Sequence, residues 1–379
     1  MSTWESFRAT GLASVESSIS VIAILGFGYY CRTKNIVTDA GEIFVSKLST
    51  HIFLPCLLIT EMGPHMTIES ITQYWPLLLA PMLVLLLTYF VGNTIGHKML
   101  GFPKYITAGV MFNNTTSLPL LMLKALGTTG ALDVLIPEGG KLEDVVKKAS
   151  AYVLLVSIVH TIARFSLGPI IMGQKEEKFE GETTPLLGGT VGRLEQQAET
   201  FYEKHIAKYI NAAVVGGLIA IFIGIIPPLK WFIFDFTPMK ASLTQAVTDL
   251  GELYPALQLF VLGAKLTAKP TEPVKPSYMA FIFCTRFVLV PIIAISSVFY
   301  LRQADENVWT RDPILDFILM MTPAGPPAIT LAAVAELGGV GEDELASIAQ
   351  MLLWSYAITP FIAPTVAVAI QVVKGEYGL

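Results

Sequence analysis

Two hydrophobic stretches of this 379-residue chain are interrupted by polar residues and prolines where each would otherwise be most apolar. The first contains a run of side chains that can form hydrogen bonds, followed by a proline: Asn113, Asn114, Thr115, Thr116, Ser117 and Pro119. The second contains three prolines around a glycine, with a threonine on each side: Thr322, Pro323, Gly325, Pro326, Pro327 and Thr330. Because proline lacks an amide hydrogen and clashes with the preceding turn, each helix is expected to kink or break there.

A helix that restarts after such a break presents free N–H groups, and these groups together with the helix dipole favour an anion. The amides of Asn113 and Asn114 would complete a neutral cage around it. The second stretch would contribute mostly backbone, helped by Thr322 and Thr330, and Gly325 would let the two stretches approach closely. The alternatives are a polar seam that hydrogen-bonds neighbouring helices and, for the second stretch, a kinked helix without a ligand.

Ionisable residues inside hydrophobic spans are candidates for a vestibule or for ion coupling. The candidates are Glu16, His51, His160, Arg164, Glu252 and Arg286. His160 and Arg164 lie one helical turn apart, so they form either a proton relay or a clamp between helices. Glu252 either faces a vestibule or pairs with an interior arginine such as Arg286. Glu61, close to the end of its predicted span, is expected to reach the membrane interface.

The composition indicates a membrane protein. Hydrophobic residues make up 53% of the chain, charged residues only 15%, and the mean hydropathy is +0.61, whereas soluble proteins carry about 25% charged residues. The apolar residues fall into blocks of about 20, enough to cross a bilayer as helices. We therefore predict an all-α protein with ten transmembrane helices, near residues 11–31, 42–62, 72–96, 104–125, 149–172, 207–229, 241–266, 277–301, 312–336 and 345–372.

Several classes of function are disfavoured by the sequence. The net charge of -5 and the absence of a long basic run argue against nucleic acid as a partner. Three dispersed cysteines do not form a disulfide framework. No P-loop, metal-ligand cluster or nucleophile–base pair is visible, so we expect neither a cofactor nor a bound metal nor an enzyme. The N-terminal apolar block lacks a basic start and a cleavage site, which favours a retained span over a signal peptide.

The long polar stretch 173–208 divides the chain into two halves, 1–172 and 209–379, each with five predicted spans. The halves repeat features in the same order: Pro55 corresponds to Pro255, and Pro81 to Pro291. Five is an odd number, so the second half enters the membrane in the opposite sense, which gives an inverted repeat. Paired interruptions in spans four and nine of such a repeat indicate the substrate site of a transporter. Basic residues and tryptophans favour external or lumenal termini and a cytoplasmic loop.

The first interrupted stretch reads Asn-Asn-Thr-Thr-Ser-Leu-Pro-Leu over 113–120. It resembles the Gly-Asn-Thr-Gly-Asn-Leu-Pro-Leu pattern of the auxin efflux carrier superfamily, in its PIN-LIKES and fungal branch. Asn114, Thr115, Leu118 and Pro119 match, whereas Asn113, Thr116 and Ser117 replace the family's Gly, Gly and Asn. The Phe-Val-Leu-Gly-Ala run over 260–264, Thr-Pro-Ala over 322–324 and Leu-Trp-Ser-Tyr over 353–356 are also similar.

This resemblance implies a scaffold of spans one, two, six and seven that holds a mobile transport domain of spans three to five and eight to ten. The broken spans four and nine would cross at the site, and an elevator motion would carry an auxin-like organic anion, such as indole-3-acetate, across the lipid bilayer. It also implies the endoplasmic reticulum, with a vacuolar, endosomal or plasma membrane as alternatives, and allows a homodimer. The rival functions are an ion-coupled antiporter or symporter of the same architecture and a membrane receptor that binds the same ligand without moving it.

Overall fold

The computed structural model describes residues 3–65, 72, 74–128, 130–137, 139–173, 212–267 and 273–378. Within these residues the regular structure is helical and contains no strand, apart from one isolated antiparallel bridge between Asn113 and Pro327. The predicted all-α class is therefore confirmed. The predicted cytoplasmic loop, 173–208, lies outside the described residues except for Gly173, which follows the end of α8 with a φ of 93°.

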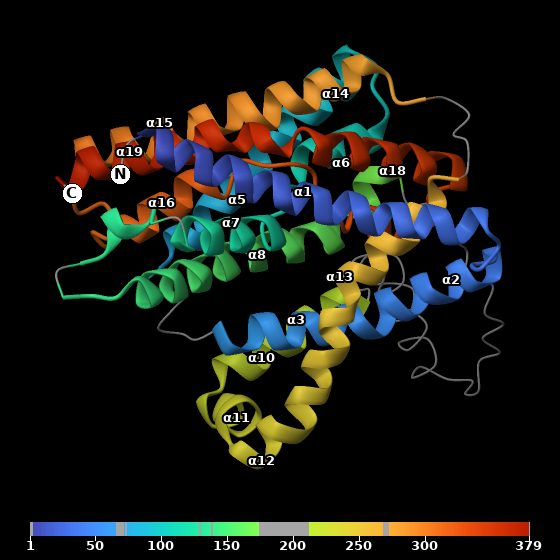
Figure 1. The fold of residues 1–379 in the computed structure, drawn as a ribbon, viewed down its shortest axis with the longest axis horizontal. Coiled ribbons are helices and arrows are strands. Elements are labelled where there is room, and N and C mark those ends of the chain that lie inside the picture. The colour runs from blue at the N-terminus through green and yellow to red at the C-terminus, as the bar shows by residue number, and fades with distance from the viewer. Residues whose placement is uncertain are drawn as a thin grey trace, which may run out of the picture.

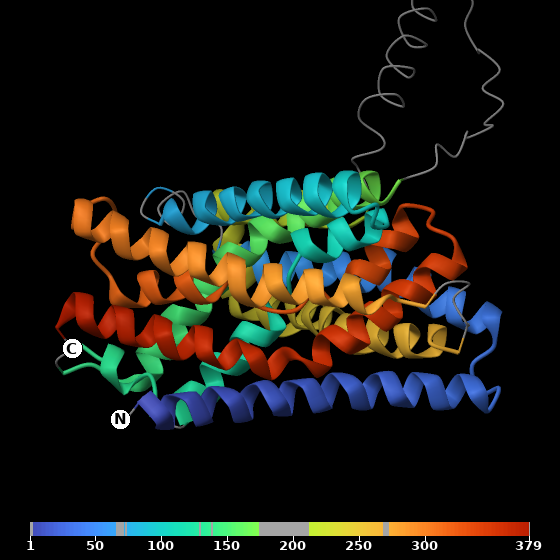
Figure 2. The same ribbon diagram turned by 90° about the horizontal axis from the view of Figure 1, so that it is seen from above.

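Long helices run side by side along the longest axis of the molecule, and the start of α1 and the end of α19 lie at the same end (Figures 1 and 2). The helices of the first half are α1 (Thr3–Thr33), α2 (Asp39–Leu48), η1 (Ser49–Phe53), α3 (Leu54–Met62), η2 (Gly63–His65), α5 (Pro76–Phe90), η3 (Val91–Met99), α6 (Lys104–Met111), α7 (Ser117–Thr128), η4 (Asp133–Leu135) and α8 (Leu142–Met172). Those of the second half are α10 (Ala212–Ile225), α11 (Pro227–Lys230), η6 (Trp231–Asp235), α12 (Thr237–Met239), η7 (Lys240–Thr244), α13 (Gln245–Lys265), α14 (Pro276–Phe283), η8 (Cys284–Leu289), α15 (Val290–Ala304), α16 (Pro313–Met321), α17 (Leu331–Leu337), α18 (Glu342–Ala357), η9 (Thr359–Ile362) and α19 (Ala363–Tyr377).

Four described helical stretches are long and apolar enough to cross a membrane, namely Asp39–Met62, Pro76–Met99, Leu142–Met172 and Pro276–Ala304. Two bent pairs raise the count to six, one turning by 106° at Ile226 and the other by 56° at Ile358. The first bend divides the span predicted at 207–229, because Pro227 and Pro228 end the preceding helix. The total of ten spans and the inverted repeat stay predictions.

Helices α3, α10 and α13 pack together, and we call them the α3–α13 group; α13 runs across α3 (Figure 1). Helix α1 packs along α13 and also against α7 and α19. Glycines permit these contacts: a Cβ on Gly263 would lie 2.1 Å from the carbonyl oxygen of Leu25, and one on Gly251 would lie 2.7 Å from the Cα of Leu57. The crossing group comprises α5 to α8 and α14 to α19. The division into scaffold and transport domains and their relative motion stay predictions.

The two interrupted stretches are enclosed by protein. Helix α6 ends at Met111 and α7 begins at Ser117, whereas α16 ends at Met321 and α17 begins at Leu331. Every residue over 105–115 and over 314–329 is buried. Irregular backbone is tolerated at membrane depth only where protein or a water-filled cavity surrounds it. The burial of these stretches therefore satisfies the condition under which a broken helix is stable in a bilayer.

A buried ion pair anchors the beginning of α16. Arg302 donates from Nε and Nη2 to the two carboxylate oxygens of Asp316, at 2.8 and 3.0 Å. Trp309 and Tyr377 donate to the same carboxylate at 2.8 and 2.9 Å. A buried charge is stable only when it is paired and hydrogen-bonded in this way. The carboxylate therefore has a structural role at the base of the second interrupted stretch.

Candidate functional site

The two interrupted stretches bond to each other through their backbones. The amide of Asn114 donates to the carbonyl oxygen of Pro326 at 2.9 Å, and the amide of Ala328 donates to the carbonyl oxygen of Phe112 at 2.9 Å. These bonds form a short antiparallel bridge, so each stretch supplies partners that the other lost where its helix ended. We call this meeting point, residues 112–116 and 322–330, the crossing.

Prolines leave carbonyl groups at the crossing without their usual donors. In a helix the carbonyl of residue i accepts from the amide of residue i+4, which proline lacks. The carbonyl of Thr115 stands four residues before Pro119 and accepts instead from the Ser157 hydroxyl at 2.7 Å. A side chain of α8 thus replaces the missing backbone donor in the first stretch.

The second stretch loses two carbonyl partners for the same reason, and two side chains replace them. The carbonyl of Thr322 accepts from Nδ2 of Asn113 at 2.8 Å, and the carbonyl of Pro323 accepts from Nη2 of Arg286 at 2.7 Å. Each of these carbonyls stands four residues before a proline. Asn113, predicted to hold a ligand, is wholly buried and is directed instead at the backbone of the second stretch.

Arg286 serves both stretches at once. Its side chain is 0% exposed and also donates to the carbonyl oxygens of Gly325 at 3.3 Å and Val110 at 3.4 Å. A cation beside the ends of α6 and α16 is stabilised by their dipoles. No ion pair joins Arg286 to Glu252 among the described residues. The φ of Gly325 is 131°, a backbone conformation that favours glycine. Lack of space is not the reason, because a Cβ at this position would meet no atom closer than 3.7 Å.

A cavity of about 80 Å³ lies between the crossing and the α3–α13 group. It is lined by α3, α8, α13 and both interrupted stretches, through Leu54, Leu57, Leu58, Glu61, Asn114, Thr116, Thr161, Arg164, Phe165, Tyr254, Pro255, Gln258, Ile329 and Thr330. We call it the polar cavity, because eight of its fourteen lining residues have side chains that can form hydrogen bonds. Its volume accommodates a few waters or a carboxylate group.

Three of the lining side chains are buried and have unsatisfied polar atoms. Arg164 is 5% exposed and donates from Nη1 to the Thr330 hydroxyl at 2.5 Å, whereas its Nε has no partner among the described residues. The Tyr254 hydroxyl and Nε2 of Gln258, on side chains 1% and 2% exposed, also have none there. No carboxylate within the described part of the chain forms an ion pair with Arg164. Buried groups of this kind gain the most from a ligand that accepts hydrogen bonds.

Of the other predicted residues of the first stretch, Asn114 and Thr116 line this cavity. Asn114 lines it and donates from Nδ2 to the Tyr356 hydroxyl at 2.7 Å, while its Oδ1 accepts from the amide of Thr116 at 3.3 Å. The hydroxyl of Thr115 is buried without a partner among the described residues. Pro119 is buried in the first turn of α7, where proline is tolerated. The side chain of Ser117 lies outside the described residues.

Several other predicted residues lie away from the polar cavity. Glu16 is in α1, and its side chain lies outside the described residues. His51 is exposed and its Nδ1 lies 3.0 Å from the carbonyl oxygen of Lys47. Glu252 is exposed on α13 and does not line the cavity. The structure therefore brings together Asn114, Thr116, Arg164 and Thr330.

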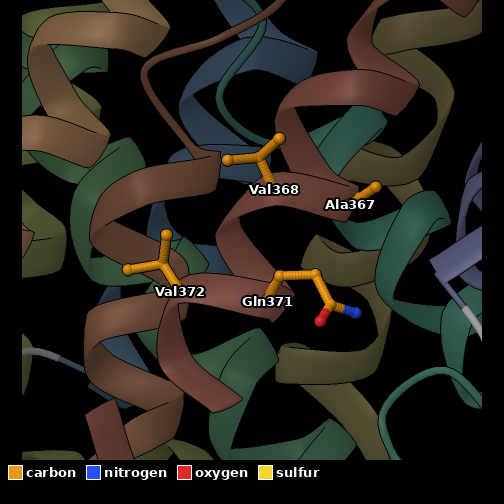
Figure 3. Close-up of a pocket in the computed structure, with 4 residues that line it drawn as sticks. All are labelled: Ala367, Val368, Gln371 and Val372. Carbon is orange, nitrogen blue, oxygen red and sulfur yellow. The ribbon is translucent and has the colours of Figure 1, made fainter. Parts of the chain in front are cut away.

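His160 and Arg164 open onto different cavities. His160 lines a second cavity of about 360 Å³, on the other side of the crossing, together with Thr322, Pro323 and apolar residues of α5 and α15. No lysine or arginine lines that cavity, so it suits a hydrocarbon group better than an anion. A third hollow, of about 260 Å³, involves only residues of α19 and none of the crossing: Ala367, Val368, Gln371 and Val372 (Figure 3).

Sequence reasoning missed four polar residues of the polar cavity. Glu61 was expected at the membrane interface and lines the cavity, and Thr161, Tyr254 and Gln258 were not singled out. A signal for the last two was present, because they flank Pro255 in an otherwise apolar helix and polar side chains inside spans are rarely without a partner or a role. Their proximity to Arg164 depends on how α3 and α13 cross, which no local pattern specifies.

The described residues form a helical fold, with several helices long and apolar enough to cross a membrane and two non-helical stretches that bond to each other. A family model described as membrane transport protein matches residues 13–367, and the chain therefore belongs to this family, the auxin efflux carrier family. It is 25% identical to protein PIN-LIKES 1 of Arabidopsis thaliana, covering 91% of this chain and 76% of that protein. An uncharacterised transporter of Schizosaccharomyces pombe is 24% identical over 91% of both chains. An uncharacterised transporter of Saccharomyces cerevisiae is also 24% identical, over 98% of this chain and 97% of that protein. Membership of this family confirms the prediction that the chain is a membrane transporter and not an enzyme.

Proposed function

We propose that this chain is a secondary carrier of small organic anions of the indole-3-acetate type, and that the carboxylate binds in the polar cavity. One observation supports this most directly: Arg164 is a buried cation without a carboxylate partner among the described residues, and it lines a cavity with further unsatisfied groups. A buried cation is stable when an anion neutralises it. The amide of Asn114 and the hydroxyls of Thr116 and Thr330 complete the surroundings of the carboxylate.

The place of the cavity supports alternating access by an elevator motion. The cavity lies between the α3–α13 group and the crossing group, so a displacement of one group against the other moves its walls apart. The cavity of about 80 Å³ has room for the carboxylate group, and separation of the two groups would admit the ring.

Binding to purified protein in lipid nanodiscs tests the site. We expect indole-3-acetate to bind and the uncharged amide of the same acid to bind much more weakly. Arg164→Gln removes a charge-assisted hydrogen bond, so its affinity for the anion should fall about 10- to 100-fold. Lys240→Gln changes an exposed basic residue of η7 and is the matched control. Equal affinity of Arg164→Gln and the unmodified protein for the anion would exclude this site.

Flux of labelled indole-3-acetate into proteoliposomes distinguishes carrier from receptor. Saturable flux that Arg164→Gln abolishes supports the carrier, whereas saturable binding without flux supports a receptor. Repeating the flux with imposed sodium or proton gradients identifies an ion-coupled antiporter or symporter. Residence in the endoplasmic reticulum rests on the family resemblance and is tested by imaging a fluorescent fusion of the full chain.

A further inference from the structure

The polar cavity contains a carboxylate as well as a cation. Glu61 stands one residue before the end of α3, is partly buried, and lines the cavity together with Arg164. Neither residue forms an ion pair within 4 Å in the part of the chain that the structure describes. The two charges therefore share one small volume without neutralising each other through direct contact.

The elements packed against α3 determine the charges that Glu61 meets. α10 carries no titratable residue over 212–225, so this described helix brings no charge toward Glu61. Arg164 on α8 and Tyr254 on α13 line the polar cavity with Glu61, whereas Asp249 on α13 and His51 on η1 are exposed outside it. Glu252 on α13 is also exposed outside the cavity, but its negative charge acts on the Glu61 carboxylate. Arg164 is thus the only cation among the residues that line this cavity.

The charge balance of the cavity changes when an anion enters. With Glu61 ionised, the cavity carries one positive and one negative charge. An organic anion adds a second negative charge, and a net charge in a buried site is unfavourable. One proton on the Glu61 carboxylate restores neutrality: its C–O⁻ oxygen forms an O–H bond, and the ligand carboxylate keeps its charge beside Arg164. The proton comes from water, and no other co-reactant is required.

We propose that Glu61 is the proton-coupling group of the polar cavity: it takes up one proton when the organic anion binds and releases it on the side where the anion leaves, so that one proton is transported with each anion in the same direction. This inference rests on the proposed function, because it uses the same cavity and the same anion. Among the ion-coupled alternatives it selects symport of the anion with a proton, and it names Glu61 as the residue that binds the proton. The transported pair is electrically neutral, so the membrane potential does not drive it.

The direction of the pH effect follows from the proton balance. If binding takes up a proton, affinity rises as the pH falls, by up to about tenfold for each pH unit over the range in which the empty site is deprotonated. The carboxyl group of indole-3-acetate is itself ionised between about pH 6 and pH 8. A change of affinity in that range therefore reports on the protein and not on the ligand.

Calorimetry of the full-length protein in nanodiscs tests the proposal. Titration of indole-3-acetate at one pH in two buffers of different ionisation enthalpy gives the number of protons taken up. We expect about one for the unmodified protein and about zero for Glu61→Gln, which keeps the size of the side chain and binds the anion with little dependence on pH. Asp249→Asn, an exposed carboxylate change on α13, is the control and should take up about one proton.

The outcomes separate the two claims. Anion binding without proton uptake by the unmodified protein overturns the role of Glu61 and leaves the anion site intact, and this measurement requires no variant to fold. Proton uptake that persists in folded Glu61→Gln overturns it as well. If the unmodified protein binds no anion at any pH, the proposed function fails and this inference fails with it.

Discussion

Asn113 offers the sharpest test of how the crossing is built. The sequence suggests that its amide holds the ligand, whereas in the structure Nδ2 donates to the carbonyl oxygen of Thr322 and the residue does not line the polar cavity. These two roles predict different results for Asn113→Ala. Loss of a ligand contact would weaken binding and leave stability unchanged, but loss of a structural hydrogen bond would lower stability first.

The expected magnitude follows from the partner left behind. The carbonyl of Thr322 cannot accept from residue 326, which is proline, so no backbone donor replaces the lost amide. An unsatisfied buried carbonyl costs about 1–3 kcal/mol, whereas hydrogen bonds between membrane helices are worth about 0.6 kcal/mol on average and about 1.7 at most. We therefore expect Asn113→Ala to lower the free energy of unfolding by about 1–2 kcal/mol, or about five- to thirtyfold in the folded-to-unfolded ratio.

Reversible unfolding in mixed detergent micelles measures this change. Ser157→Ala creates the same defect at the carbonyl of Thr115 and should have a similar effect. Thr322→Val removes only a hydroxyl that donates to a carbonyl within its own helix, at 2.8 Å, so it should change the free energy of unfolding by less than about 0.5 kcal/mol. An unchanged unfolding free energy in Asn113→Ala, together with loss of anion binding, would refute the structural role and restore the ligand role.

Three further variants test other parts of the fold by the same unfolding measurement. Arg286→Lys keeps the charge but not the planar group that reaches three carbonyls, so a loss of about 1–2 kcal/mol is expected, and no loss would contradict the clamp. Asp316→Ala leaves a buried arginine without its carboxylate and should cost about 3–5 kcal/mol; a change below 1 kcal/mol would show that the pair is not needed. Gly251→Ala places a methyl group 2.7 Å from the Cα of Leu57 and should cost about 1–3 kcal/mol. The control is Gly26→Ala, whose new Cβ has no atom within 4 Å. Equal effects of the two variants would argue against the tight contact.

Much of the fold could be predicted from sequence because the signals are local. Apolar blocks predict membrane helices, and the prolines near 119 and 323–327 predict where helical hydrogen bonding fails. The structure places a non-helical stretch next to each of these prolines. The bend at Ile226 was missed, although Pro227 and Pro228 are a local signal that a helix ends there.

The sequence by itself determined the class of protein, through its apolar blocks of about 20 residues, and the carbonyls that proline leaves without donors, which depend on residues four positions apart. Only the tertiary structure decided which side chains satisfy those carbonyls and which face the ligand. Asn113 reaches a carbonyl 209 positions away, and Glu61, Arg164 and Gln258 share a cavity only because α3, α8 and α13 meet there. Such contacts depend on the rotation and crossing of packed helices, which the interlocking of many side chains decides together.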